Sequence, residues 1–398
     1  MTTDRRSYGR IAATAILILL LTVGLSVAQV EILQPAPDTA LSGPVHVVVR
    51  TASEEVSGIH ARVGDRPWVA MYRADDDTWR ARIDTTLAPN GETAIRVQQW
   101  PVGDDSAAEV AVTLDNPLRH YWGNIHSHTS VSDGRMRPDE AYAYARDIAQ
   151  LDFFTLADHL ERVEPAEWRE TVRAATLTTD DGSFVALTGL EWTKSVGHMC
   201  VYEPAGHIWP KELAEFYTFA PGNCAVAKFN HPGWRDTNFE EFAYSAEGDA
   251  AIQLIEVRSH AEMLWYIEAL NRGWHLAPDG SDDTHRERWG TSGRWTVILA
   301  PGLSYHTVMD ALASRRTYST QDRNCRLWFT LNDAVMGEVI EEPVSTAVIT
   351  VAVDDPDEDD RIELIELFAN GEVIRTDRPD SASHRWSLKL TPEPGSHY

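Results

Sequence analysis

Short runs of β-branched and apolar residues dominate residues 29–116. Residues 45–49 and 94–97 are two such runs, and Pro89-Asn90-Gly91 provides a turn between them. No long stretch in this region has the period of a helix. About seven short strands at this spacing predict an N-terminal immunoglobulin-like β-sandwich, which is a statement about fold and not about chemistry.

The pattern changes in residues 117–321, where apolar strands are followed by helical stretches. Residues 138–150 predict a helix with Pro138 in its first turn, and 152–156 predict a buried strand. Further strands are expected at 184–187, 225–229, 252–257 and 295–299. Repeated alternation of strand and helix over about 200 residues predicts an α/β domain with a parallel sheet or a barrel.

Strand patterns return in residues 322–398. Residues 347–353 and 363–368 are β-rich, and the second of these runs into the turn Asn370-Gly371. We therefore expect a second small β-sandwich at the C-terminus. Because the next strand would be starting where the sequence stops, we expect this domain to be incomplete.

The first 28 residues have the features of an export signal. Three arginines precede an apolar run at 11–21, and Ser26-Val27-Ala28 supplies small residues for cleavage. We expect a signal peptide at 1–28, a periplasmic or secreted protein, and no stable membrane insertion after cleavage. A retained membrane anchor is the alternative, and the secretory and twin-arginine routes both stay open.

Charge and cysteine content narrow the partners and the chemistry. Lys and Arg number 35 against 61 Asp and Glu, so the net charge is −26 and the protein repels phosphate polymers. Nucleic acid is therefore not an expected partner. Three cysteines allow at most one disulfide, and in an oxidising compartment we expect Cys200 to pair with Cys224.

Histidines are concentrated in the middle region, and several of them follow predicted strands. In His126-Ser127-His128 the two imidazoles lie on the same side of an extended strand end, because side chains two apart share a face. An α/β barrel gathers its active-site groups at the carboxyl ends of its strands. The other groups placed there are Asp158-His159, Glu191, His231-Pro232 and Asp283-Thr284-His285.

Imidazole and carboxylate ligands together suit zinc, manganese or iron. A carboxylate such as Glu191 can also bridge two cations. The combined pattern predicts a centre of two or three divalent metal ions. The sequence has neither a glycine-rich phosphate loop nor a Gly-x-Ser-x-Gly elbow, which argues against nucleotide kinases and serine hydrolases.

Residues 121–321 resemble the PHP family, the polymerase and histidinol phosphatase metalloesterases. Four segments carry the resemblance: 124–129 with Ser132-Asp133-Gly134, then 156–159, 230–232 and 280–285. The flanking β domains, the signal peptide and residues 315–320 are similar to the secreted, carbaryl-hydrolase-like branch of that family. The resemblance implies a distorted (β/α)₇ barrel with a metal centre.

The resemblance also implies a ligand set for up to three ions. The implied ligands are His126, His128, Glu191 and Asp283 for the first ion, Glu191, His198 and His231 for the second, and His159, His285 and Asp133 for the third. Glu191 is thus the expected bridge. His159 or His260 is expected to protonate the leaving group.

These features predict a metal-dependent hydrolase. Its metal-activated hydroxide would cleave a small phosphoester or a carboxylic or carbamate ester. One alternative is an amidohydrolase-type metalloenzyme, which also begins with His-x-His but normally needs a carbamylated lysine and a lone terminal aspartate. Another is a noncatalytic surface-binding protein with a vestigial barrel. Trp192, Trp234 and Trp265 could line an apolar pocket, although tryptophan in such domains is usually core.

Overall fold

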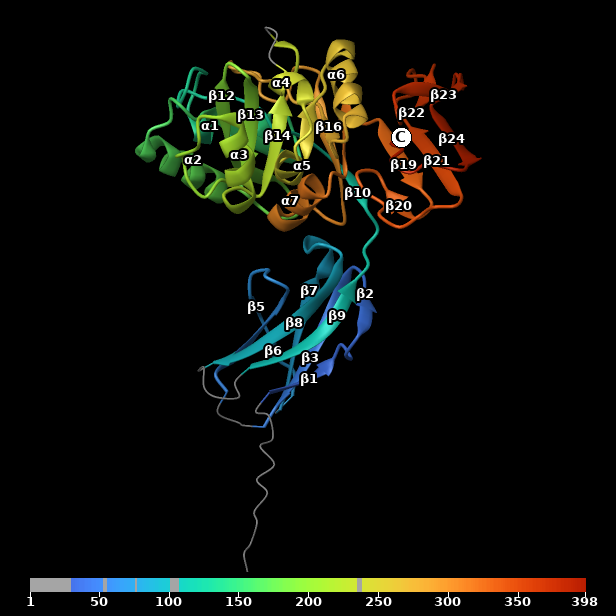
Figure 1. Cartoon of the computed structure of the whole chain (residues 1–398). Coiled ribbons are helices and arrows are strands. Elements are labelled where there is room, and N and C mark those ends of the chain that lie inside the picture. The colour runs from blue at the N-terminus through green and yellow to red at the C-terminus, as the bar shows by residue number, and fades with distance from the viewer. Residues whose placement is uncertain (1–29, 53–55, 76, 101–106, 235–237) are drawn as a thin grey trace, which may run out of the picture.

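The computed structural model describes residues 30–398 except 53–55, 76, 101–106 and 235–237. It shows an N-terminal β-sandwich, a central barrel-like domain and a small C-terminal β domain (Figure 1). The predicted signal peptide at 1–28 lies outside the described residues. Of the helices in the described part, none is long and apolar enough to cross a membrane.

The N-terminal domain consists of two facing sheets. One sheet has the order β1 (Val30–Gln34), β3 (Pro44–Thr51), β7 (Thr78–Asp84) and β6 (Tyr72–Arg73). The other has the order β2 (Thr39–Leu41), β9 (Ala107–Leu114), β8 (Gly91–Trp100), β4 (Gly58–Val63) and β5 (Val69–Ala70). Burial alternates along β7, because every second side chain points into the space between the sheets. Val47, Val49 and Ile95 are fully buried in that core.

The central domain is built on one sheet of nine strands. Their order is β16 (Ala277–Asp279), β15 (Leu254–Glu256), β14 (Val226–Asn230), β13 (Gly197–Tyr202), β12 (Val185–Lys194), β11 (Phe153–His159), β10 (Arg119–Asn124), β17 (Trp295–Ala300) and β18 (Thr317–Thr320). The outer strands approach one another, because Thr317 Oγ1 donates to the Pro278 carbonyl at 2.9 Å and Ser319 Oγ donates to the Val257 carbonyl at 2.6 Å. The sheet is therefore a nearly closed barrel.

The prediction of a parallel sheet is only partly right. β10, β11 and β12 pair in parallel, as do β14, β15 and β16. However, β13 pairs antiparallel with both β12 and β14, and β17 pairs antiparallel with β10 and β18. Only two residues separate β12 from β13, and so short a connection permits a hairpin but not the crossover that parallel strands need.

Most of the helices lie on the outer face of this sheet (Figure 1). These are α1 (Pro138–Asp147), α2 (Pro165–Thr178), α3 (Leu213–Phe219) with the 3₁₀ turn η2 (Ala220–Gly222), α4 (Phe239–Phe242), α5 (Ala246–Ala251) and α6 (His260–Asn271). The buried side chains of α7 (Tyr305–Ala313) instead join the core inside the barrel, and a second 3₁₀ turn, η1 (Thr85–Leu87), belongs to the N-terminal sandwich. The predicted helix at 138–150 is α1, which has Pro138 at its first turn and ends three residues early. Tyr142 on α1 is buried, and its hydroxyl donates to the Leu187 carbonyl at 2.7 Å.

The C-terminal domain has two small sheets. One has the order β20 (Ala334–Val335), β19 (Arg326–Leu331), β21 (Ala347–Asp354) and β24 (Ser383–Leu390), and the other pairs β22 (Ile365–Ala369) with β23 (Glu372–Asp377). Ile349, Val351, Leu367 and Trp386 form the core. As predicted, Asn370-Gly371 is the hairpin turn, and both residues have positive φ.

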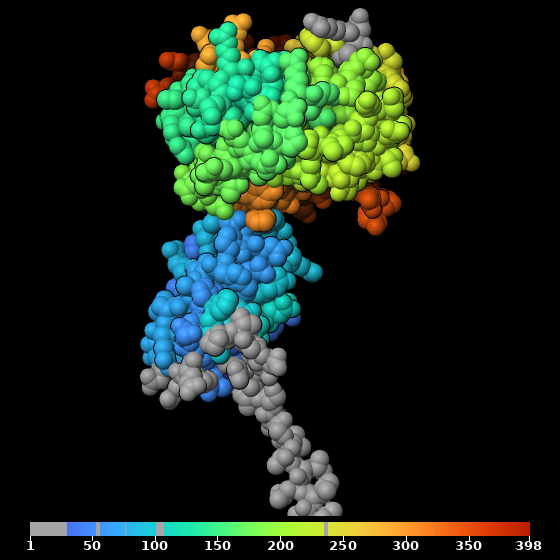
Figure 2. Space-filling view, turned by 90° about the vertical axis from the view of Figure 1, so that its left-hand side faces the viewer, coloured from blue at the N-terminus to red at the C-terminus, as the bar shows by residue number. Residues whose placement is uncertain are grey.

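The N-terminal sandwich packs against one end of the barrel (Figure 2). Arg66 forms an ion pair with Asp181, and Ser304 Oγ donates to the Leu87 carbonyl at 2.7 Å. β10 begins at this end, because Arg119 pairs with Ala300, four residues before Ser304. The carboxyl ends of the parallel strands therefore lie at the opposite end of the barrel.

Candidate metal centre

The strands deliver polar side chains to the barrel end that faces away from the sandwich. His126 and His128 follow β10, His159 is the last residue of β11, and His231 directly follows β14. Glu191 lies on β12 opposite Cys200 of β13. The β12–β13 hairpin adds a side chain that a purely parallel barrel would lack, because it pairs Thr193 with His198.

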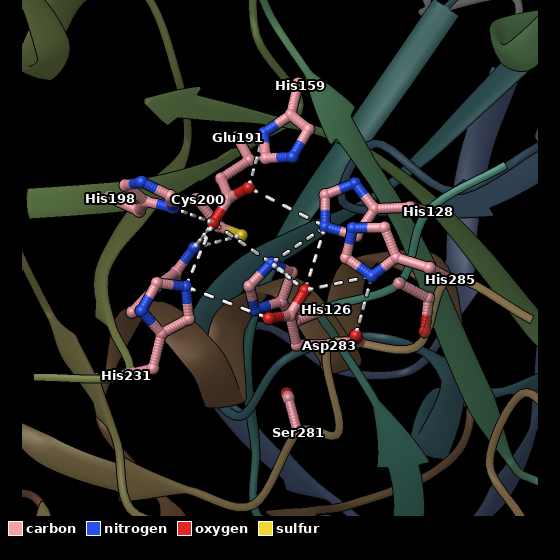
Figure 3. Close-up of polar contacts among 12 residues, drawn as sticks. His126, His128, His159, Glu191, His198, Cys200, His231, Ser281, Asp283 and His285 are labelled. Atoms are coloured by element: carbon pink, nitrogen blue, oxygen red, sulfur yellow. Dashed lines mark hydrogen bonds and ion pairs between the residues drawn. The ribbon is translucent and has the colours of Figure 1, made fainter. Parts of the chain in front are cut away.

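Glu191 lies at the middle of this cluster (Figure 3). Its Oε1 is 3.2 Å from His126 Nε2, 3.2 Å from His198 Nδ1 and 3.4 Å from His231 Nε2. Its Oε2 is 2.8 Å from His159 Nδ1. Only 1% of the side chain is exposed, so this carboxylate is surrounded by imidazoles and has almost no contact with solvent.

Asp283 provides a second carboxylate. Its Oδ1 lies 3.0 Å from His128 Nε2 and 3.4 Å from His126 Nε2, and its Oδ2 lies 3.9 Å from His231 Nε2. Glu191 and Asp283 therefore both face His126, His128 and His231. This arrangement suits ions held between the two carboxylates.

A third group lies nearer the surface. Asp133 Oδ1 is 3.2 Å from His285 Nε2, and Asp133 Oδ2 is 3.5 Å from His159 Nε2. The His285 ring stacks on His128 with 4.1 Å between centroids. Asp133 is about one-third exposed, so this group is more accessible than the one around Glu191.

The chemistry of the donor atoms fits divalent transition metals. His126 Nε2 and His128 Nε2 face each other at 3.3 Å, where two protonated nitrogens would repel, whereas two lone pairs can share a cation. In each of four overlapping groups the donor atoms lie within 4.8 Å of one another. The groups are His126–His128–Glu191, Glu191–His198–His231, His126–His231–Asp283 and His128–Asp133–His159–His285.

All nine predicted metal ligands belong to these four groups. The predicted proton donor His260 does not. It is exposed at the first position of α6, and within the described residues no hydrogen bond or ion pair links it to the cluster. Its position in the sequence predicted a place near the barrel end, but the direction of its side chain depends on how α6 packs.

Two carboxylates of the centre, Glu191 and Asp283, have pKa values below the usual range. Burial opposes ionisation of Glu191, but His126, His159 and His198 outweigh burial and hold its pKa well below the usual value. Burial also opposes ionisation of Asp283, and His126 and His128 nevertheless lower its pKa. Both side chains are therefore anions at neutral pH, as metal ligands must be.

The histidines differ from one another. Burial favours the neutral form of His126, yet the surrounding anions raise its pKa well above the usual value. For His159, too, burial acts against protonation, and its contact with Glu191 raises the pKa. Burial dominates at His128 and lowers its pKa. Protons therefore compete with cations at His126 and His159.

Two of the candidate ligands have unusual backbone conformations. His231 has φ of 26° and Asp283 has φ of 50°, in a region that residues other than glycine rarely adopt. Such a conformation costs about 1–3 kcal/mol per residue and persists where the surrounding structure imposes it, often at functional sites. In this conformation His231 faces Glu191, and Asp283 faces His126 and His128.

Sequence reasoning missed Asn230, although it lies in the segment 230–232 that carries the resemblance. Its Nδ2 donates to Glu191 Oε1 at 2.8 Å and contacts Cys200 Sγ at 3.1 Å. This amide helps to orient the central carboxylate.

The expected disulfide between Cys200 and Cys224 is wrong. All three cysteines are free. Cys200 belongs to the core inside the barrel, whereas Cys224 packs on the outer core and its thiol donates to the Ala220 carbonyl at 3.4 Å. The two thiols thus lie on opposite faces of the sheet, a separation that spacing along the chain could not reveal.

A buried ionic network below the centre was also not anticipated. It comprises Lys228 on β14, Glu256 on β15 and Asp279 on β16, all fully buried. Glu256 Oε2 lies 2.8 Å from His126 Nδ1, so the network touches the centre directly. The available signal was a charged residue inside an otherwise apolar predicted strand, which is costly unless it is paired.

The rim of the centre carries an aromatic and a cationic side chain. Trp234 is 44% exposed, and its ring lies edge-on to the rings of His198 and His231, with 5.4 Å between centroids in each case. Arg162 Nη1 lies 3.0 Å from Asp133. The other two tryptophans considered for a pocket belong to the core instead, since Trp192 is fully buried and Trp265 packs against the same cluster.

No protein-family model and no curated protein matches the chain. The similar solved structures include an endo-β-1,4-mannanase from Thermotoga petrophila, 13% identical over 22% of this chain and 20% of that one, with a TM-score of 0.20. Fibronectin(III)-like modules of Clostridium thermocellum are 19% identical over 21% of this chain and 92% of theirs, with a TM-score of 0.16. A Bacteroides fragilis protein assigned as an alpha-galactosidase is 9% identical over 91% and 96%, with a TM-score of 0.26. Likenesses this weak carry no argument about function.

Proposed function

We propose that this protein is a metal-dependent hydrolase of the PHP type that cleaves a small phosphoester or a carboxylic or carbamate ester. The observation that carries the proposal is the position of Glu191, whose Oε1 lies within 3.4 Å of three imidazole nitrogens while its Oε2 contacts a fourth. A buried carboxylate in this position can bridge two cations.

The donor set would hold two or three divalent ions of zinc, manganese or iron. Bound ions of this kind lower the pKa of a coordinated water and stabilise the negative charge that develops during hydrolysis. Glu191 would hold two ions, and Asp283 would balance their charge on the other side. With two ions bound, His159 is available to protonate the leaving group, since it borders the centre whereas His260 does not.

The charge distribution favours a small substrate. A net charge of −26 disfavours nucleic-acid polymers. At the rim, Arg162 provides a cation for an anionic ester, and Trp234 provides an apolar surface for the rest of the molecule.

An amidohydrolase-type centre is the nearest alternative. That type of centre bridges its metals through a carbamylated lysine, which must be neutral before carbon dioxide can add to it. Lys228 is the buried lysine closest to the centre, but its Nζ forms ion pairs with Glu256 and Asp279 at 2.8 Å each. Burial lowers the pKa of Lys228, but its contacts with these carboxylates outweigh burial and raise it. Glu191 lies among four imidazoles and could bridge two ions itself, which supports the PHP-type centre.

A noncatalytic protein with a vestigial barrel is the second alternative. One experiment distinguishes it from the proposed hydrolase. Protein purified without chelator should contain at least two transition-metal ions per chain by elemental analysis, and should hydrolyse a member of a panel of chromogenic phosphate, carboxylate and carbamate esters. Metal with no turnover on any ester would favour the binding protein. Absence of bound metal, even after reconstitution with zinc, manganese and iron, would reject both the PHP-type hydrolase and the amidohydrolase-type centre.

We also propose that the mature protein begins near Gln29 and is exported to the periplasm or beyond the cell. Support comes from the arginines, apolar run and small residues of 1–28. N-terminal sequencing of protein from the native cell tests this proposal. An intact Met1 on a membrane-bound chain would favour an anchor instead.

A further inference from the structure

Every histidine of the centre needs one ring nitrogen without a proton if it is to bind a metal. The nitrogen that is free depends on the hydrogen bond made by the other one. His126 is fully buried, and its Nε2 faces Glu191, Asp283 and His128 at 3.2–3.4 Å. Its Nδ1 points away from the centre, to Glu256 Oε2 at 2.8 Å.

Glu256 is held rigidly from the other side. Lys228 Nζ donates to Glu256 Oε2 at 2.8 Å, and Arg258 Nε lies 2.9 Å from Glu256 Oε1. Lys228 also donates to Asp279 Oδ1 at 2.8 Å, and Ser281 Oγ donates to the same oxygen at 2.6 Å. Lys228, Glu256 and Asp279 are fully buried, so water does not compete for these bonds.

Such a network costs desolvation energy, and an apolar core of the same volume would often be as stable. Its position therefore calls for a reason other than stability. Each member comes from a neighbouring strand, β14, β15 or β16, and Glu256 pairs with Asp279 across the sheet. The network ends at one imidazole, that of His126.

We propose that Glu256 is a positioning residue, which fixes the His126 tautomer with the proton on Nδ1 and directs Nε2 to the metal ions, and that Lys228 and Arg258 hold Glu256 in place. This inference rests on the proposed metal centre but not on any particular ester substrate. A carboxylate behind a ligating histidine raises its basicity and fixes its ring, and loss of such a partner typically lowers metal affinity by about 10- to 100-fold.

Glu256→Gln tests the inference, because glutamine keeps the shape of the side chain but cannot satisfy all of its neighbours. Oε2 faces two donors, His126 and Lys228, and Oε1 faces Arg258. In either orientation the amide NH₂ group points at another donor. We expect zinc affinity, measured by competition with a chromogenic chelator, to fall by about 10- to 100-fold.

Asp279→Asn is the matched control. It removes one carboxylate from the same buried lysine, but no contact joins Asp279 to His126 among the described residues. We expect its zinc affinity to stay close to that of the wild type. Equal losses in Glu256→Gln and Asp279→Asn would mean that the network only balances charge, and would overturn the inference.

A direct measurement of the tautomer does not depend on Glu256→Gln or Asp279→Asn. In zinc-loaded wild-type protein with ¹⁵N-labelled histidine, the resonance that disappears in His126→Gln should show a proton on Nδ1 and none on Nε2. A proton on Nε2 would overturn the inference. If Glu256→Gln does not fold, Glu256→Asp keeps the charge but withdraws the carboxylate, and it should also weaken zinc binding; unchanged affinity in that variant would count against the inference.

The proposed function can fail separately. Zinc binding with the predicted tautomer, but without hydrolysis of any ester, would reject the hydrolase and leave the role of Glu256 intact. A wild-type protein that binds no metal would reject both.

Discussion

Glu191 is the residue on which the most ligand contacts converge, so its replacement tests the centre directly. In Glu191→Gln a neutral amide with one weak oxygen donor replaces two anionic oxygens and no longer offsets the repulsion between two cations. We expect a loss of bound metal and a fall in turnover of about 10²- to 10⁴-fold. Elemental analysis and steady-state rates on the best ester measure the two effects.

His46→Ala provides the control, because His46 is exposed on β3 of the N-terminal sandwich. Its metal content and rate should match those of the wild type. Full metal content and wild-type kcat in Glu191→Gln would show that another group bridges the ions.

The cysteines give a second prediction at the scale of single residues. Burial raises the pKa of Cys224 to about 12 and that of Cys325 to about 11, and Cys200 is fully buried. Because the thiolate is the reactive form, iodoacetamide should modify the native protein only slowly at pH 8. After denaturation without a reductant, mass spectrometry should find three alkylated cysteines. Finding only one alkylated cysteine would instead support a disulfide between Cys200 and Cys224.

At the scale of elements, the β12–β13 hairpin brings His198 to Glu191, and it depends on Gly197. The φ of Gly197 is 152°, and a Cβ atom there would lie 2.2 Å from the Phe239 ring. We therefore expect Gly197→Ala to destabilise the protein by about 1–3 kcal/mol in urea unfolding and to weaken metal binding through His198.

Gly206→Ala is the comparison for this hairpin. No atom lies within 4 Å of a Cβ built at Gly206, so its free energy of unfolding should change by less than about 0.5 kcal/mol. Unchanged stability and metal affinity in Gly197→Ala would indicate that Phe239 of α4 moves aside without a cost in free energy.

At the scale of the whole molecule, metal binding should stabilise the fold, and more so as the pH rises. A ligand at 100 times its Kd adds about 2.7 kcal/mol. The pKa values of His126 and His159 are raised in the folded protein, so without metal their protonation stabilises the fold below about pH 6.5. This contribution is lost as the pH rises through the pKa values of the folded state. Metal needs the unprotonated imidazoles, whereas Glu191 stays ionised throughout this range.

Thermal unfolding with zinc and with a chelator measures this linkage. The difference in Tm should be larger at pH 8 than at pH 6, and Glu191→Gln should show little difference at either pH. A difference that shrinks as the pH rises would mean that the histidines are not the ligands.

Much of this protein is visible in its sequence because local chemistry determines it. Alternating apolar residues predicted the two flanking β domains, and Asn370-Gly371 predicted a hairpin, because strand faces and positive-φ turns depend on near neighbours. Seven of the nine candidate ligands could be selected because His, Asp and Glu at the ends of predicted strands meet at one edge of a sheet, whereas Asp133 and His198 were implied only by the family resemblance.

What depends on contacts across the sheet could be decided only by the tertiary structure. The separation of Cys200 from Cys224 and the outward position of His260 follow from which face each strand or helix turns to the core. Glu256 is the clearest case. In the sequence it is one acidic residue in an apolar run, 130 positions from His126. The two side chains meet only because β15 and β10 belong to the same nearly closed barrel.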